Sequence, residues 1–172
     1  MCSHDADNTL STTRSAPIST EPTPTVPLLV LDTNVALDWI AFDDVRVQPI
    51  VQAIERGTLR VVTSQVCLLE LRRTLGYAQV KLAADAQTLA FRRYCAHAAV
   101  CAIPEPAAVA GLPLCEDPDD QKFLELAWHA RASHLLTRDK ALLTLARRIA
   151  ELRRFVVLAP DAFLYEAGSP PG

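Results

Sequence analysis

The sequence predicts an α/β fold in three layers, with a mostly parallel central sheet flanked by helices. Short apolar runs alternate with segments of helical periodicity, which is typical of strand–helix–strand units. The runs are apolar throughout, as expected for strands that helices cover on both faces. Half of the 172 residues are hydrophobic but only 6% are aromatic, a composition that suits helices on a buried sheet better than a β-sandwich.

The chain is predicted to hold one folded domain between two tails. Residues 1–27 include 14 Ser, Thr or Pro residues and few large apolar ones. Such a segment cannot bury enough surface to offset the entropy of ordering, so we expect a disordered tail. The domain is expected over residues 28–166, which is long enough for a sizeable core, and a flexible C-terminus over 167–172.

The first half of the domain is predicted to combine two strands with three helices. Asp32-Thr33-Asn34 offers capping side chains for a helix after the first strand, Gly57 ends the next helix, and Ser64 caps the third. The expected elements are strand 28–31, helix 35–40, helix 47–56, strand 60–63 and helix 65–75.

The second half is predicted to continue this alternation after a proline-rich loop. Asp117-Pro118 is expected to open a helix, with proline at its favoured first position. The expected elements are helix 83–98, strand 100–103, helix 117–132, strand 134–137, helix 139–150 and strand 155–158.

The charge of the chain excludes nucleic-acid binding by bulk attraction. The formal net charge is −3, and beyond residue 27 there are 16 basic and 17 acidic residues. A protein that holds a polyanion through overall charge should be strongly basic, so any such contact must be local. One local basic cluster fits either a solvated helix face or an RNA-binding rim, and comprises Arg138, Lys140, Arg147, Arg148, Arg153 and Arg154.

Cysteine usage and hydropathy point to the cytoplasm. The five cysteines form no Cys-x-x-Cys pair, and the spacing of Cys95, His97 and Cys101 fits no familiar zinc pattern. We find no signal-peptide pattern and no apolar stretch approaching about 18 residues, so no membrane partner is expected.

Four acidic residues are placed where a parallel sheet builds its sites. Asp32 and Asp139 follow strands, Asp120 lies in the first turn of a helix, and Glu70 lies within the helix after the second strand. Sites of α/β sheets form where strands end and helices begin. Each Asp could also be a simple helix cap. Glu70 lies too deep in its helix for capping, and it either belongs to a solvated stripe with Arg73 or Thr74 or points into a polar site.

A cluster of these acids would have to take up a proton, spread apart or bind a cation. Two carboxylates about 4 Å apart repel by roughly 4 kcal/mol at an effective dielectric constant near 20. Mg²⁺ or Mn²⁺ is the expected counter-ion, because both prefer hard oxygen ligands. Such an ion can activate water and neutralise the charge that develops on a phosphodiester, with no Ser, Cys or His nucleophile.

The order of these motifs resembles the PIN domain family over about residues 28–160. The matching segments are Leu31-Asp32-Thr33-Asn34-Val35, Ser64 with Leu68-Leu69-Glu70-Leu71, Asp120 with Leu124 and Ala127, and Leu135-Leu136-Thr137-Arg138-Asp139. The resemblance implies a Rossmann-like fold and endonucleolytic cleavage of RNA with Mg²⁺ or Mn²⁺. It places Asp32, Glu70, Asp120 and Asp139 at the metal, with Asn34, Ser64 and Thr137 around it.

Within that family, Asp117-Pro118-Asp119-Asp120 is most similar to the group assigned as toxins of bacterial toxin–antitoxin pairs, the VapC-like ribonucleases. This resemblance implies a homodimer and a cognate antitoxin as partners. Helix register favours Asp120 as the third ligand, with Asp117 second and Asp119 also open.

Two other functions compete with a ribonuclease. A strand followed by Asp32-Thr33-Asn34 is superficially similar to haloacid-dehalogenase-like phosphatases, but these require a second Asp where this chain has Asn34. The domain could also be a PIN-like module that binds RNA or protein without cleavage, although all four acids are present.

Overall fold

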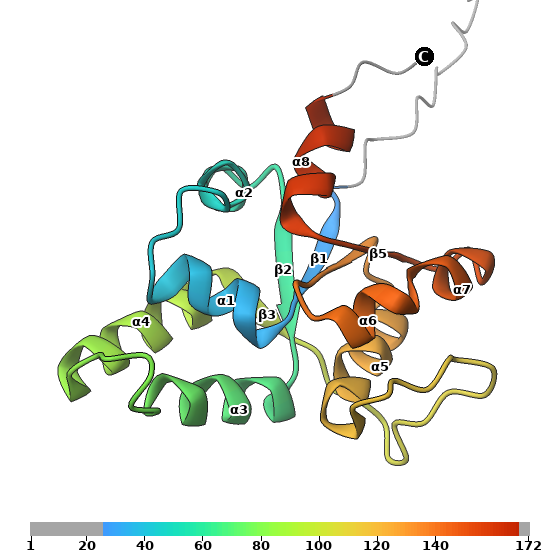
Figure 1. The fold of residues 1–172 in the computed structure, drawn as a ribbon, viewed down its shortest axis with the longest axis horizontal. Helices are drawn as coiled ribbons and strands as arrows, with labels where there is room; N and C mark the ends of the chain where they lie inside the picture. Colours follow the sequence, from blue (N-terminus) through green and yellow to red (C-terminus); the bar gives the residue numbers. More distant parts are fainter. Residues whose placement is uncertain (1–25, 169–172) are drawn as a thin grey trace, which may run out of the picture.

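Five parallel strands form one sheet in the order β3-β2-β1-β4-β5 (Figure 1). The computed structural model describes residues 26–168. The strands are β1 (Leu28–Leu31), β2 (Arg60–Thr63), β3 (Ala98–Val100), β4 (His134–Leu136) and β5 (Val156–Leu158). Every neighbouring pair is parallel, which confirms the predicted α/β class.

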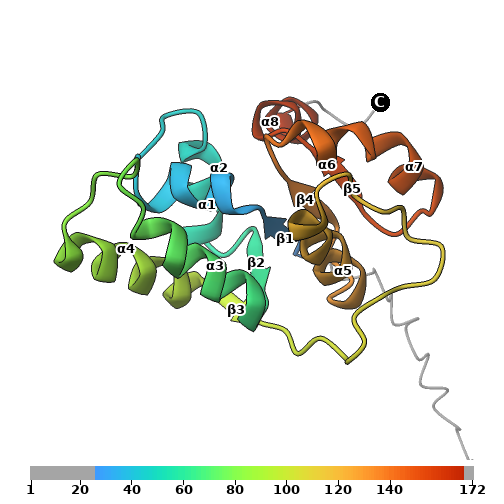
Figure 2. The same cartoon turned by 60° about the horizontal axis from the view of Figure 1, so that its bottom comes forward.

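Helices cover both faces of this sheet (Figure 2). Helices α1, α3 and α4 pack against one another on one side, and α5, α6 and α7 contact β1, β4 and β5 on the other. The bounds are α1 Thr33–Ile40, α2 Gln48–Glu55, α3 Gln65–Leu75, α4 Ala84–His97, η1 (a 3₁₀ turn) Pro118–Asp120, α5 Gln121–His129, α6 Lys140–Thr144, α7 Ala146–Glu151 and α8 Pro160–Gly168.

The central strand explains why the apolar runs are unbroken. Leu29 and Leu31 belong to the core cluster under α1 to α4, whereas Val30 belongs to the cluster under α5 to α7. Leu29 and Val30 are fully buried. Successive side chains of a strand point to opposite faces, so burial on both faces requires an apolar residue at every position.

Several predicted elements differ from the structure in their bounds. The third strand, expected at 100–103, is Ala98–Val100, paired with Val61–Thr63, and it takes over the end of the expected helix 83–98. The expected helix 117–132 is instead the 3₁₀ turn η1 followed by α5, which ends at His129. Helix 139–150 divides at Leu145, whose N–H bonds three residues back to Leu142.

The last helix was not predicted. Pro160 occupies the first position of α8, where a missing N–H costs nothing, and Phe163 packs into the core beside α2. The helix reaches Gly168, past the expected domain end at 166. Residues 1–25, which fall in the expected tail, and 169–172 lie outside the described residues.

Topology gathers the functional candidates at one edge of the sheet. In a parallel sheet all strands end on the same side, here the lower edge in Figure 1. Chain order runs outward from β1 through β2 to one side and from β4 to β5 on the other. Ligands of such sheets bind at this reversal of strand order, which here lies directly after β1 and β4.

No helix between residues 26 and 168 is both long enough and apolar enough to cross a membrane.

Candidate active site

Asp32 is the buried centre of the site. It directly follows β1, and the pairing of Leu31 with Leu136 places it beside Thr137 at the end of β4. Its side chain is only 2% exposed. Oδ1 accepts the N–H of Val35 at 2.7 Å and caps α1, while Oδ2 accepts the Thr137 hydroxyl and the Arg138 N–H at 3.3 Å.

Those hydrogen bonds oppose the cost of burying the carboxylate. Burial raises the pKa of Asp32, and the bonds from Thr137, Val35 and Arg138 lower it, with the net result above the ordinary value. The nearby charge of Asp139 raises it further. Asp32 does cap α1, but capping alone does not explain why this carboxylate is buried near the charge of Asp139.

Asp139 is held against Asp32 through Thr137. The fully buried Thr137 hydroxyl donates to Asp32 and accepts the N–H of Asp139 at 2.9 Å. Asp139 caps α6 by accepting from Ala141 at 2.7 Å and from Leu142 at 3.4 Å. Both bonds use Oδ1, so capping leaves Oδ2 of this half-buried side chain for another ligand.

Asp120 lies at the start of α5 but its side chain makes no capping bond. Its pKa is raised to about 6, first by burial, then by the charges of Asp139 and Asp117, while Lys122 lowers it and Asp32 contributes a smaller increase. An acid that neither caps its helix nor ionises readily is poorly explained by local structure. Because the charges of Asp139 and Asp32 both contribute to this raised pKa, the three acids lie within electrostatic range of one another.

Asp117 and Asp119 have more ordinary roles. Both side chains are exposed, and Asp117 caps η1 by accepting the N–H of Asp119 at 2.9 Å. Asp117 still lies near enough to raise the pKa of Asp120. This arrangement favours Asp120 over its two neighbours as the acid that faces the site.

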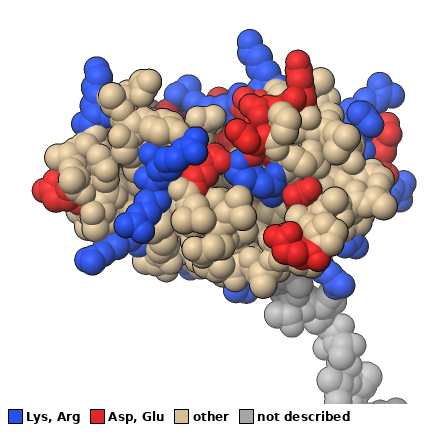
Figure 3. Space-filling model, turned by 90° about the horizontal axis from the view of Figure 1, so that it is seen from below, with Lys and Arg blue, Asp and Glu red and all other residues tan. Residues whose placement is uncertain are grey.

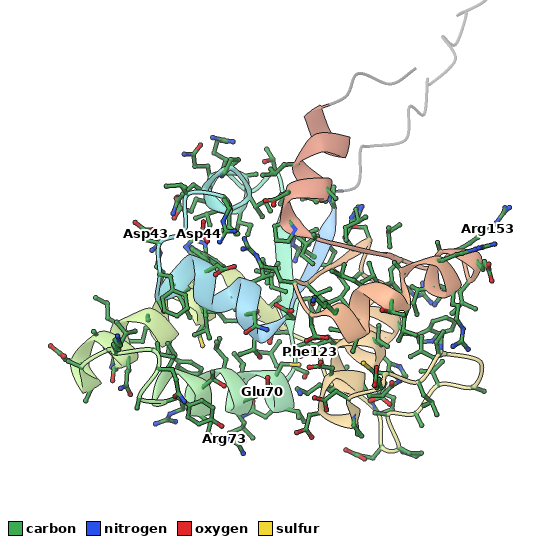
Figure 4. All side chains as sticks on the ribbon, in the orientation of Figure 1. Asp43, Asp44, Glu70, Arg73, Phe123 and Arg153 are labelled. Atoms are coloured by element: carbon green, nitrogen blue, oxygen red, sulfur yellow. The ribbon has the colours of Figure 1, made fainter. Side chains whose placement is uncertain are left out.

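Glu70 turns inward from α3. Its Oε1 accepts the hydroxyl of Thr33, the residue after Asp32, at 2.5 Å, and its Oε2 lies 2.5 Å from the ammonium of Lys122 on α5. Figure 4 shows Glu70 on α3 facing α5, where Phe123 lies, whereas Arg73 projects away from the sheet. Glu70 is therefore joined to both sides of the site rather than to solvent.

The predicted supporting residues Asn34, Ser64 and Thr137 differ in whether they contact the acids. Thr137 bonds two of the acids, as described above. Ser64 is buried at the end of β2 and caps α3 by accepting the N–H of Cys67 at 3.3 Å. Asn34 is exposed on α1. Of the three, Thr137 has direct contact with the acidic cluster.

An open groove lies between α3 and the η1–α5 segment and is bordered by two of the four acids. Its volume is about 790 Å³, and its wall includes Glu70 and Arg73 from α3 and Asp120 and Lys122 from the facing segment. Viewed from this side, basic and acidic side chains are interspersed over the face rather than forming one field of a single sign (Figure 3). A polyanion in the groove would therefore be held by individual cations.

The sequence patterns did not indicate Thr33 and Lys122 as residues of the site. A lysine in the first turn of a helix is unfavourable to the helix dipole, and this was the available signal for Lys122. The basic cluster near Asp139 also divides: Arg138 turns inward to Asp38, with Nε to Oδ2 at 3.0 Å, and Arg154 lies over the ring of Trp128. These two arginines thus have partners within the fold.

The donor set suits a hard divalent ion, although it is not closed around one. Carboxylate oxygens of Asp32, Glu70, Asp120 and Asp139 are the ligand type that Mg²⁺ and Mn²⁺ prefer. Within residues 26–168, however, no three His, Cys, Asp or Glu side chains converge as a ready metal site. Burial first, and then repulsion from Asp139 and Asp117, raises the pKa of Asp120, and such an ion would remove the repulsion.

Removal of the Thr137 hydroxyl tests the support of this cluster. We expect Thr137→Val to lower the free energy of unfolding by about 2 kcal/mol, because Asp32 loses a buried donor and the Asp139 N–H loses its acceptor. Denaturant unfolding of metal-free protein measures the change. Thr137→Ser, which keeps the hydroxyl, is the control, and equal stability of the valine variant would contradict the assigned contacts.

Comparison with known proteins identifies one family. A family model described as PIN domain matches residues 28–141, which is more than half of the chain and includes all four acids. No curated protein matches the sequence.

Proposed function

The chain belongs to the PIN domain family, and from this membership and the site geometry we propose that it is an Mg²⁺- or Mn²⁺-dependent endoribonuclease. PIN domains are in general nucleases that use divalent metal ions and bind RNA. The finer assignment to this chain is supported above all by one observation. Beyond the effect of burial, the charge of Asp139 raises the pKa of both Asp32 and Asp120, and Asp120 and Glu70 line the same groove.

In this proposal Asp32, Glu70, Asp120 and Asp139 would hold the ion. The bound ion would polarise water and the scissile phosphate, which is the chemistry that divalent ions supply in phosphodiester cleavage. Thr137 fixes Asp32 and Asp139 relative to each other, and Thr33 orients Glu70. Such supporting hydrogen bonds typically affect metal affinity or activity by about 10- to 100-fold.

Metal removal is the direct test of this function. Purified protein is incubated with single-stranded RNA in Mg²⁺ or Mn²⁺, and we expect internal cleavage that EDTA abolishes and that added metal restores. Tight RNA binding without cleavage would favour a non-catalytic module instead. Turnover of a small phosphomonoester with RNA left intact would favour a phosphatase.

The proposed biological role is that of the toxin in a toxin–antitoxin pair, acting in the cytoplasm as a homodimer. This role rests on the similarity of Asp117-Pro118-Asp119-Asp120 to that group of the family. Induced expression in bacteria is expected to arrest growth, and co-expression of the protein encoded beside its gene is expected to relieve the arrest. Normal growth at high levels of active enzyme would argue for a role in RNA processing.

A further inference from the structure

Lys122 occupies a position that its own helix does not favour. It is the second residue of α5, where the positive end of the helix dipole repels a cation. Its side chain is nevertheless only 17% exposed, although a lysine at this place could extend into solvent. Since the helix dipole does not favour the ammonium at this position, contacts with other groups must hold it there.

Three contacts hold the ammonium in the site. Its Nζ lies 2.5 Å from Oε2 of Glu70, it donates to the carbonyl oxygen of Asp119, and it lies 4.7 Å from the centroid of the Phe123 ring. An ammonium has three donors, and its charge is attracted both to the carboxylate and to the face of the ring. These three contacts hold the ammonium of Lys122 beside Glu70.

The Glu70 carboxylate has both oxygens engaged in this state. Oε1 accepts from Thr33 and Oε2 pairs with Lys122, so a metal ion at Oε2 would have to share that oxygen with the ammonium or displace it. A divalent ion bound at Oε2 would meet the ammonium at short range and be repelled by it.

We infer that Lys122 is a built-in counter-cation of the acidic site, which holds Glu70 in the metal-free protein and competes with the divalent ion for it. The inference rests on the metal site of the proposed function. Binding of the ion would break the Glu70–Lys122 pair, so that the Glu70 carboxylate contacts the divalent ion instead of the ammonium. The pair thereby stabilises the empty site and lowers its affinity for metal.

Calorimetric titration of the purified full-length protein with Mn²⁺ tests the exchange. Lys122→Met keeps the length and apolar character of the side chain but removes the charge, and we expect it to bind Mn²⁺ about three- to tenfold more tightly than the unsubstituted protein. Lys81→Met removes one charge from an exposed loop position and should leave the affinity unchanged. Lys122→Gln is a second variant should the methionine variant fold poorly.

A double substitution assigns the effect to the pair. In a Glu70→Gln background the contested carboxylate is absent, so adding Lys122→Met should no longer increase Mn²⁺ affinity. The melting temperature provides a second measurement: Lys122→Met should melt lower than the unsubstituted protein without metal and gain more from saturating Mn²⁺.

The outcomes separate this inference from the proposed function. If the unsubstituted protein binds Mn²⁺ and cleaves RNA but Lys122→Met binds no more tightly, the inference is overturned and the nuclease stands. If Lys122→Met binds more tightly but no form cleaves RNA, the counter-cation stands and the nuclease does not. Absence of Mn²⁺ binding by every form overturns both.

Discussion

Asp32→Asn is expected to lower the rate of metal-dependent RNA cleavage by about a thousandfold, equivalent to roughly 4 kcal/mol of transition-state stabilisation. Asp32 is the most buried of the four acids and lies between the ends of β1 and β4. Its carboxylate would supply negative charge to the ion, and the neutral amide of asparagine would not. Initial rates with saturating RNA and Mn²⁺ measure the loss.

The same substitution should leave the fold intact, which separates a chemical effect from unfolding. Asparagine can still accept the N–H of Val35 through its side-chain oxygen and so keep the cap of α1. Burial raises the pKa of Asp32, so loss of its charge removes a destabilising feature of the metal-free protein. The amide nitrogen of asparagine cannot accept from Thr137 and Arg138 as Oδ2 does, which offsets this gain, so the metal-free melting temperature should stay close to that of the unsubstituted protein.

A matched control removes an acid elsewhere. Asp85 is exposed in the first turn of α4 and accepts the N–H of Ala86 at 2.9 Å, a bond that asparagine can also make. Asp85→Asn should cleave RNA at an unchanged rate. Retention of full cleavage by Asp32→Asn would refute the proposed active site.

The positions of Asp32 and Thr137 were predictable because strand ends are encoded locally. A buried strand requires an unbroken apolar run, and the first polar residue after that run marks the edge of the sheet. Once the strands are known to be parallel, these polar residues must lie side by side. The sequence thus locates this part of the candidate site without knowledge of long-range contacts.

The orientation of Glu70 was not predictable in this way. Leu69 is 58% exposed while Glu70 is half-buried, the reverse of what hydrophobicity alone favours. The reason is that α3 presents Leu68 and Leu71 to the core and Glu70 to the groove. Which polar stripe of a helix faces solvent and which faces a site depends on segments far away, here Thr33 and Lys122.

The shifted third strand and the missed α8 have a common cause. Ala98–Val100 is short and rich in alanine, so its pairing with β2 rather than its own propensity determines where it starts. Helix α8 is stabilised by Phe163 packing into the core beside α2. In both cases tertiary contacts outweigh a weak local signal.

Asp120→Asn is expected to stabilise the metal-free protein and to weaken its metal-dependent activity. The folded-state pKa of Asp120 is raised to about 6 from an ordinary value of 3.8, so the folded protein binds this proton more tightly than the unfolded chain. Metal-free stability should therefore fall as pH rises from about 4 to 6 and stay low above that. The asparagine variant has no carboxyl group at this position, so its stability should not show this fall with pH.

At pH 7.5 we expect Asp120→Asn to gain about 1 kcal/mol, because partial exposure of the side chain screens much of the effect. For a chain of this size that corresponds to a melting temperature higher by roughly 2–4 °C, and the gain should be smaller at pH 5. Asp119→Asn, which alters the exposed neighbouring acid, is the control and should show no such pH-dependent gain.

Metal should reverse this order of stability. Mn²⁺ binds the ionised carboxylate, so the unsubstituted protein should gain more in melting temperature from Mn²⁺ than Asp120→Asn, and its RNA cleavage should exceed that of the variant by about 100-fold. Protons and metal compete for Asp120, so Mn²⁺ affinity of the unsubstituted protein should weaken as pH falls through about 6. If Asp120→Asn were less stable than the unsubstituted protein without metal at pH 7.5, the Asp120 carboxylate would be stabilising the fold. The proposed site requires the opposite, because it assumes that the ionised carboxylate destabilises the metal-free protein and that a bound ion offsets this cost.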